Sequence, residues 1–398
     1  MTTAAECPLC GDTDVHPFNE YGPRCLAGDY HIVSGHVTNV WCGRCGAGWN
    51  RDMMGDAELS SFYGAYTKKV DAEDEDDLLF GAADAEVETL TASQARFLAE
   101  HVTASTGRML DIGCGKGAFL KAFKAVRGGW RFAGIEPSRE EVALARRDAD
   151  LDVRQGMFGA VPLEREAFDV LTIMHVLEHV PRPLEAVRQM RDALKEGGLL
   201  FVEVPNTLDL NMFYDVLLFE HLFHFQPETL AWLLEREGFD IVAHQQATTY
   251  GAQRIVARKR ANGAAESAWP RVRMADGRTA WQQLWRSMNE LAEHGAARAA
   301  DGRRVAVFGA GMTAATWLVY TALHDAKILG LFDESPWKIG RTLFDRPIHA
   351  LSDIRTHAPD TVLLATMPNS QALVARKLAA ICASGTEILG FGAGVSAR

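Results

Sequence analysis

The stretch MHVLEHVP combines histidine and glutamate at a spacing that suggests zinc chemistry. It holds His175, Glu178 and His179 in the order H-x-x-E-H, which zinc proteases of the inverted type carry on a helix. Such a site needs both imidazoles on one helical face. The residues before it, FDVLTI, are typical of a buried strand, so we expect the stretch to leave the strand's carboxyl end and enter a loop. This placement argues against a zinc protease.

A second stretch, FEHLFHF (219–225), holds Glu220, His221 and His224. Pro227 and leucines at helical spacing follow, which predicts a helix start, so we expect the three side chains in a loop. An imidazole beside a carboxylate suits general base catalysis because its pKa lies near neutrality. We take His221 as the candidate base, with Glu220 orienting it or sharing the proton. His224 is expected to pack in the interior.

The N-terminal cysteines form two C-x-x-C pairs, in CPLCG and CGRCG. Each pair can bring two thiolates to one metal ion, and the glycine that follows lets the backbone turn beneath it. Four thiolates leave no position for water, which is the form of a structural zinc site. The alternative is two reduced, unrelated turns. The expected zinc ligands are Cys7, Cys10, Cys42 and Cys45.

A glycine-rich turn follows an apolar strand in RMLDIGCGKGAFLKAF, where the strand ends in Asp111. Its glycines let the backbone approach a ligand closely, and amides of the next helix can face the ligand's polar end. The next strand, in RFAGIEPS, ends in Glu136, which can accept hydrogen bonds from ribose hydroxyls or can simply precede a helix cap at Pro137. The glycines of the turn are Gly113, Gly115 and Gly117.

Strands and helices are expected to alternate through the middle of the chain. A helix between Asp84 and Thr106 precedes the glycine turn, and VRQGMF, FDVLTIMHVLEHV and GGLLFVEVPN follow as further strands or strand ends. Such alternation predicts an α/β fold with a parallel sheet and a site at its carboxyl edge.

A second glycine turn, in RRVAVFGAGMTAATWLVY, follows a helix expected over 280–299. Gly309, Gly311 and Ala314 form G-x-G-x-x-A, and Asp333 lies about 20 residues further on, the spacing of a dinucleotide-binding fold. TVLLAT and EILGFG supply more strands. We therefore predict a C-terminal Rossmann-like domain, and a fused NAD-dependent oxidoreductase is one hypothesis for it.

Length and charge limit the possible partners. The 398 residues suffice for two or three domains, and the net charge of −11 disfavours binding to nucleic acid. No apolar run approaches the roughly 18 residues of a membrane span, and MTTAAECPLC does not resemble a secretory signal. We expect a cytoplasmic protein without a membrane partner.

The predicted domains are a zinc module over 1–70, a central domain over 71–260 and the Rossmann-like domain over 278–398. The acidic stretch DAEDEDD (71–77) is interpreted as a linker or a mobile lid.

LDIGCGKGAFL, GIEPS, FDVLTIMHVLEHVPRP and GGLLFVEVPN together resemble the ordered motifs of class I S-adenosylmethionine (SAM)-dependent methyltransferases. The resemblance implies that His179 contacts the substrate, whereas Glu178 and His175 either take part or stabilise the loop. It also implies that SAM is held by Asp111, Gly113, Gly115, Gly117, Glu136, Met157, Phe158 and Met174.

The order of the parts resembles the three-domain, zinc-containing sugar C-methyltransferases, which act on nucleotide-linked keto-deoxysugars. In that family the last domain helps to hold the nucleotide-sugar. The resemblance implies proton removal from a carbon next to a ketone, with His179 stabilising the enolate oxygen.

Two departures from this family keep other functions open. Leu218 stands where the family has a tyrosine, and in TYGAQR only Gly251 and Arg254 match its pattern. Methylation of an oxygen or nitrogen on a sugar or small metabolite is therefore the alternative. A binding or scaffold protein is a third hypothesis, against which the complete glycine turn argues.

Overall fold

The computed structural model describes residues 6–65, 89–261, 263, 267–391 and 396–397. By their contacts the residues form two compact units, each assembled from separate segments of the sequence. Unit 1 comprises Met1–Asn19, Thr38–Thr207 and Glu220–Met274, and unit 2 comprises Glu20–Val37, Leu208–Phe219 and Ala275–Arg398. The three-domain division stays a prediction, and the acidic stretch 71–77 lies outside the described residues.

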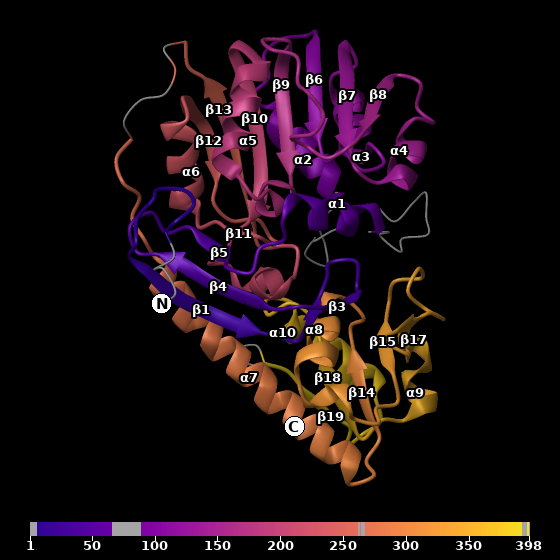
Figure 1. The fold of residues 1–398 in the computed structure, drawn as a ribbon. Helices are drawn as coiled ribbons and strands as arrows, with labels where there is room; N and C mark the ends of the chain where they lie inside the picture. The colour runs from indigo at the N-terminus through magenta and orange to yellow at the C-terminus, as the bar shows by residue number, and fades with distance from the viewer. Residues whose placement is uncertain (1–5, 66–88, 262, 264–266, 392–395, 398) are drawn as a thin grey trace. The chain divides into compact units, whose positions relative to one another are not determined.

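Unit 1 contains a seven-stranded sheet of order β12-β13-β10-β9-β6-β7-β8 (Figure 1). The strands from β6 to β10 pair in parallel, whereas β13 pairs antiparallel with β10 and with β12. The strands are β6 (Gly107–Ile112), β7 (Trp130–Glu136), β8 (Leu151–Gln155), β9 (Phe168–Met174), β10 (Leu194–Pro205), β12 (Phe239–Gln245) and β13 (Ala252–Lys259).

The helices of this unit bury apolar side chains against that sheet. In α3 (Ala118–Val126), Phe119, Leu120 and Phe123 lie on one face and join the core with Phe201 of β10. The helix expected between 84 and 106 is observed as α2 (Leu90–Ala99), and residues 66–88 lie outside the described residues. The other helices are α1 (Asp56–Ala65), α4 (Arg139–Ala145), α5 (Pro183–Ala193) and α6 (Pro227–Arg236).

The strand order changes direction at β6. The chain goes from β6 to β7 on one side and later returns to place β9 on the other side. In open parallel sheets, ligands bind outside the carboxyl ends of the strands at such a switch point. The glycine turn follows β6 directly, so the fold places it at this point.

A smaller sheet of order β1-β4-β5-β11 carries the cysteine pairs (Figure 1). It is built from β1 (Val15–Tyr21), β4 (Val37–Cys42), β5 (Gly48–Asn50) and β11 (Phe223–His224). The expectation that His224 lies in a loop is wrong, because its backbone pairs with Gly48 of β5 and its Nε2 lies 3.1 Å from Asn39 Oδ1. The residues next to His221 therefore belong to the sheet of the cysteine module.

Unit 2 contains a second sheet of order β16-β17-β15-β14-β18-β19-β20, in which the strands from β17 to β19 pair in parallel. The predicted Rossmann-like fold is confirmed. The strands are β14 (Val305–Phe308), β15 (Leu331–Asp333), β16 (Thr342–Leu343), β17 (Arg346–Ala350), β18 (Thr361–Leu364), β19 (Glu387–Leu389) and β20 (Ser396–Ala397).

The helices of this part are α7 (Met274–Ala300), α8 (Met312–Tyr320), α9 (Ile354–His357) and α10 (Gln371–Ile381). Helix α7 begins at Met274, before the predicted 280. The predicted start was too late because Gly277 and its polar neighbours resemble a connection in the sequence, although the backbone there is helical. Among the residues that the structure describes, no helix is both long and apolar enough to cross a membrane.

Candidate active site

The glycine turn after β6 requires glycine for the fold itself. Gly113 and Gly117 have φ angles of +73° and +78°, which L-residues rarely adopt. A Cβ on Gly113 would lie 2.3 Å from Val176 Cγ2, and one on Gly117 would lie 2.7 Å from Leu151 Cδ1. Gly115 is more open, since the nearest atom to its Cβ would be Glu141 Oε2 at 3.6 Å. The turn therefore leaves backbone accessible at Gly115, as a closely bound ligand requires.

Glu136 at the end of β7 holds this turn. Its Oε2 accepts a hydrogen bond from the Gly115 amide at 3.0 Å, and its Oε1 accepts one from the Ser138 amide at 2.8 Å. Each carboxylate oxygen retains a further lone pair, so the group can also accept bonds from ribose hydroxyls. The structure thus brings the predicted acid and the predicted glycine turn together.

The other predicted cofactor residues lie at the ends of different strands and differ in how deeply they are buried. Asp111 is buried near the end of β6, where Thr172 Oγ1 donates to its Oδ1 at 2.6 Å and burial raises its pKa to about 7. Met157 and Phe158 follow the end of β8, whose Gln155 pairs with Glu136. Met174 ends β9 and packs against the hydrophobic core. The hydrogen bond from Thr172 therefore ties Asp111 of β6 to the neighbouring strand β9.

We expect Glu136→Ala to weaken binding of the cofactor product S-adenosylhomocysteine by about 10- to 100-fold. The change removes a charged acceptor and the anchor of the Gly115 amide, and hydrogen bonds to charged groups contribute about 1.5–3 kcal/mol. Calorimetric titration measures the effect. Glu140→Ala, at an exposed position of α4, is the matched control and should bind normally. Equal affinities in both variants would contradict a role of Glu136 in binding.

The stretch MHVLEHVP leaves β9 after Met174 and forms only the three-residue 3-10 helix η1 (Leu177–His179). His175 has a φ angle of +52°, so the chain turns sharply before η1 begins. His175 and His179 therefore share no helical face, as the sequence predicts.

His175 lies between two buried carboxylates. Its Nε2 is 3.0 Å from Glu203 Oε1, and its Nδ1 is 3.6 Å from Glu178 Oε1. Burial alone would lower its pKa, but the two neighbouring carboxylates raise it to about 10. His175 is thus a cation that ties the end of β9 to β10.

Glu203 extends this network through β10 to β13. It accepts a hydrogen bond from Gln94 Nε2 at 2.6 Å and pairs with Arg254, whose Nη2 donates to Tyr250 Oη at 2.6 Å. Glu203 is not among the site residues predicted from the sequence, although a single charge within the apolar run LLFVEVP is a signal for it. Arg254, noted from the family pattern, therefore supports the site through Glu203.

The three predicted catalytic side chains come together beyond β9. His179 Nδ1 lies 2.9 Å from the backbone oxygen of Glu220, and the rings of His179 and His221 meet edge to face at 4.8 Å. The ring of Tyr63, from α1, lies 6.0 Å from that of His179, a neighbour that the sequence analysis did not identify. Glu178 and Glu220 are each 1% exposed. The cluster is therefore mostly buried, although 18% of the His179 side chain is exposed.

The protonation of His179 follows from this geometry. Burial lowers its pKa to about 4, so the ring is neutral at pH 7. A carbonyl oxygen only accepts, hence Nδ1 carries the proton and donates it to Glu220 O. Nε2 is left with a lone pair. In this tautomer His179 can accept a hydrogen bond from a substrate but cannot donate one to an enolate oxygen, which argues against the enolate role.

The four predicted zinc ligands also form one cluster. Cys7 and Cys45 have their sulfurs 3.6 Å apart, and so do Cys10 and Cys42. Sulfurs about 2.3 Å from a tetrahedral zinc ion lie about 3.8 Å from one another. The donor set and its spacing therefore fit a structural zinc ion. Thr229 Oγ1 of α6 donates to the backbone oxygen of Cys45 at 2.6 Å, which ties the cluster to that helix.

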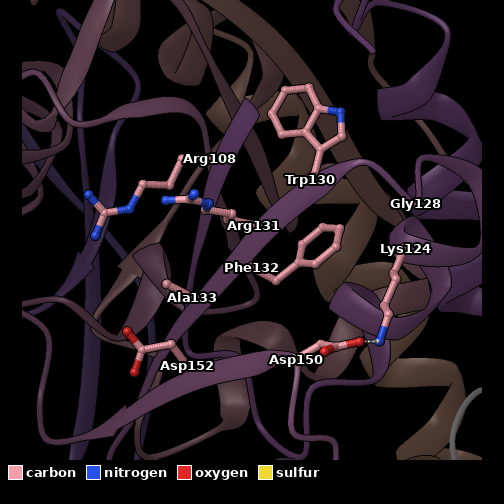
Figure 2. Close-up of a pocket in the computed structure, with 9 residues that line it drawn as sticks. All are labelled: Arg108, Lys124, Gly128, Trp130, Arg131, Phe132, Ala133, Asp150 and Asp152. Carbon is pink, nitrogen blue, oxygen red and sulfur yellow. Dashed lines mark hydrogen bonds and ion pairs between the residues drawn. The ribbon is translucent and has the colours of Figure 1, made fainter. Parts of the chain in front are cut away.

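A hollow at the opposite edge of the large sheet is not the candidate site (Figure 2). It lies at the amino ends of β6, β7 and β8, whereas ligands of such sheets bind at the carboxyl ends. Its charged groups also pair locally, as Lys124 does with Asp150 at 2.6 Å. Its lining residues are Arg108, Lys124, Gly128, Trp130, Arg131, Phe132, Ala133, Asp150 and Asp152.

Two family models match the chain. One, described as a methyltransferase domain, matches residues 84–244, and the other, described as a C-methyltransferase C-terminal domain, matches residues 263–392. Together they cover the large sheet of unit 1 except β13, and most of unit 2.

Several curated relatives are ubiquinone biosynthesis O-methyltransferases. That of Actinobacillus pleuropneumoniae serotype 5b is 34% identical over 109 residues, which are 25% of this chain and 46% of the relative. That of Neisseria meningitidis serogroup C is 30% identical over 169 residues, which are 38% of this chain and 70% of the relative. The chain thus spans about half the length of the first of them and over two thirds of the second.

A solved SAM-dependent methyltransferase of Thermotoga maritima, a possible histamine N-methyltransferase, is 22% identical, with a TM-score of 0.36 over 43% of this chain and 89% of that chain. From the relatives and from the two matching domains, the chain belongs to the SAM-dependent methyltransferases.

Proposed function

We propose that the protein transfers the methyl group of SAM to a carbon of a nucleotide-linked keto-deoxysugar. The observation that carries the proposal is the match of residues 263–392 to a C-methyltransferase C-terminal domain, beside a methyltransferase domain in the same chain. Carbon is a demanding acceptor, because a carbon next to a ketone must lose a proton before it can attack. The site must therefore supply a base.

The buried cluster beyond β9 offers such a base. His221 is 7% exposed and lies beside the ring of His179, and its neighbour Glu220 can orient it. His221 takes the proton from the substrate carbon, while the lone pair on His179 Nε2 accepts a hydrogen bond from a substrate hydroxyl. The turn at Gly113–Gly117 and Glu136 hold SAM, which when bound supplies an electrophilic sulfonium methyl group.

Unit 2 offers a place for the nucleotide part of the substrate. Asp333 Oδ2 accepts a hydrogen bond from the Ala310 amide at 2.7 Å, and its Oδ1 accepts one from the Ser335 amide at 2.9 Å. This is the arrangement of Glu136 around its own glycine turn, repeated at the end of β15. Lys338 Nζ lies 3.5 Å from Asp333 Oδ2, which adds a cation suited to phosphate. The repeated geometry supports a nucleotide-binding role.

The proposal is tested with SAM carrying a ¹³C-labelled methyl group and a panel of nucleotide-linked keto-deoxysugars. Mass spectrometry should detect a singly methylated product, and NMR should place the label on a carbon next to the ketone. The absence of product from every keto-sugar, while calorimetry shows that the cofactor product binds, would contradict the proposal.

Methylation of an oxygen or nitrogen on a sugar or small metabolite is the second candidate. The relatives named as O-methyltransferases favour it, and so does Leu218 at the position of the family tyrosine. A hydroxyl already carries a lone pair and needs less activation than a carbon. The same NMR spectrum separates the candidates, because a methyl group on oxygen and one on carbon differ clearly in chemical shift.

A further inference from the structure

Glu178 is a buried carboxylate that lacks hydrogen bonds. It is 1% exposed, and neither of its oxygens has a hydrogen-bond partner in the part of the chain that the structure describes. The neighbouring cation His175 has its Nδ1 3.6 Å from Glu178 Oε1. The Nε2 of the same ring already bonds Glu203. A dry carboxylate that accepts no hydrogen bond is costly to keep in a fold. The position therefore suits a ligand that brings positive charge.

His179 directs a second lone pair at the same place. Its Nδ1–H donates to the backbone oxygen of Glu220 at 2.9 Å, so in the neutral imidazole the lone pair is on Nε2. Nε2 lies 4.0 Å from Glu178 Oε1. Two lone pairs facing each other across this gap repel, whereas a cation between them is attracted by both. An imidazole that donates its other N–H to a backbone carbonyl is also the usual arrangement of a metal ligand.

His221 completes the set from a distant part of the sequence. One ligand atom from each of Glu178, His179 and His221 lies within 4.8 Å of the other two. Ligand atoms about 2.0–2.2 Å from one tetrahedral ion lie about 3.3–3.6 Å apart, so ion binding would draw the three side chains together by up to about 1.5 Å. Two imidazoles and one carboxylate, with a fourth position open, are a ligand set of known zinc sites.

We propose that Glu178, His179 and His221 bind a divalent transition-metal ion, with zinc as the fitting ion, at a site separate from the cysteine cluster. The H-x-x-E-H stretch thus contributes metal ligands after all, but through Glu178 and His179 rather than through its two histidines. His175 stays outside the set, since both its ring nitrogens face carboxylates.

Metal binding at this site has a consequence that rests on the proposed function. If His221 removes the substrate proton, an ion on its lone pair blocks that step. Zinc beyond the amount bound by the cysteine cluster then inhibits methyl transfer. The site would therefore be an inhibitory metal site of the enzyme.

Cobalt binding to the full chain tests the site without measuring activity. Thiolate–cobalt charge transfer in the near ultraviolet reports the cysteine cluster, whereas an ion held by nitrogen and oxygen gives only visible ligand-field bands. We expect two ions per chain in the wild type, the second without a charge-transfer band. Elemental analysis after equilibration with buffered zinc should also give two.

Glu178→Gln and, as a second variant at the same site, His221→Ala should each bind one ion only. Glu185→Gln, at an exposed position of α5, is the matched control and should bind two. Cofactor-product binding by calorimetry identifies any variant that fails to fold. One ion per chain in the wild type, or two in both site variants, would overturn the proposal.

An activity measurement separates this inference from the proposed function. Excess zinc should lower turnover at least about tenfold, as expected when a general base is blocked. If a second ion binds but turnover does not fall, the metal site is supported and His221 is not the general base. If the wild-type protein turns over substrate but binds only one ion, the proposed function is supported and the second metal site is contradicted.

Discussion

Replacement of His221 by alanine is expected to lower turnover by about 10²–10⁴-fold, the usual contribution of a general base. The affinity for the cofactor product should not change, because the glycine turn and Glu136 lie at the ends of other strands. The side chain is 7% exposed and its ring packs at 4.8 Å against His179, so a water molecule replaces the imidazole poorly. Single-turnover rates with labelled SAM and calorimetry measure the two quantities.

His224→Ala is the matched control for this variant. The imidazole lies three residues further on, is 2% exposed, and has its Nε2 3.1 Å from Asn39 Oδ1. Its removal should cost about 1–3 kcal/mol of the free energy of unfolding, because the buried hydrogen bond to Asn39 Oδ1 is lost. Turnover per folded molecule should be retained. If His221→Ala keeps near-normal turnover at saturating substrate, His221 is not the base and His179 becomes the candidate.

Removal of the zinc ion predicted for the cysteine cluster should abolish most turnover while cofactor affinity survives. The cluster closes a module too small to fold without its metal, so Cys42→Ser or chelation should unfold strands β4 and β5. Strand β5 pairs with β11, and the Asn50 amide donates to the backbone oxygen of Leu222 at 2.9 Å. Leu222 is next to His221. Displacing a base by about 1 Å costs roughly 10²-fold in rate, and we expect at least that loss.

The glycine turn and Glu136 belong to the other sheet, so cofactor binding should persist after zinc loss. Zinc content, turnover and calorimetric affinity measured on one sample compare the three properties. Cys25→Ser is the control, because this thiol lies outside the cluster and donates to the backbone oxygen of Gly35. It should keep both its zinc and its turnover. A cofactor affinity that falls in step with zinc content would show that the two parts are not independent.

The cofactor turn could be predicted because its signals are local. Glycines with positive φ angles, an apolar strand before them and an acid at the end of the next strand all lie within one stretch of sequence. The strand at Phe223–His224 could not be predicted in this way, since His224 and its side-chain partner Asn39 are 185 residues apart. A two-residue strand has no periodicity of its own, and only the tertiary fold creates it.

The chemistry of the cluster was predicted by residue type but not by protonation. His179, Glu220 and His221 were singled out from the sequence, yet the tautomer of His179 depends on a backbone oxygen that the fold brings to its Nδ1. Glu178 was left undecided between structure and function for the same reason. Its lack of hydrogen bonds among the described residues depends on which groups pack around it, and the motif alone does not contain that information.

The pairing of β11 with β5 also limits how this protein can be recombined. Residues 223–224 complete a sheet whose other strands come from the N-terminal part of the chain. The cysteine module and the histidine-bearing segment therefore form one structural unit and must be exchanged together. A chimaera that takes residues 6–50 from a relative but keeps the native residues 219–226 would pair two strands, β5 and β11, that did not evolve together. Transplanting both segments from one parent should give an active hybrid, whereas exchanging either alone should not.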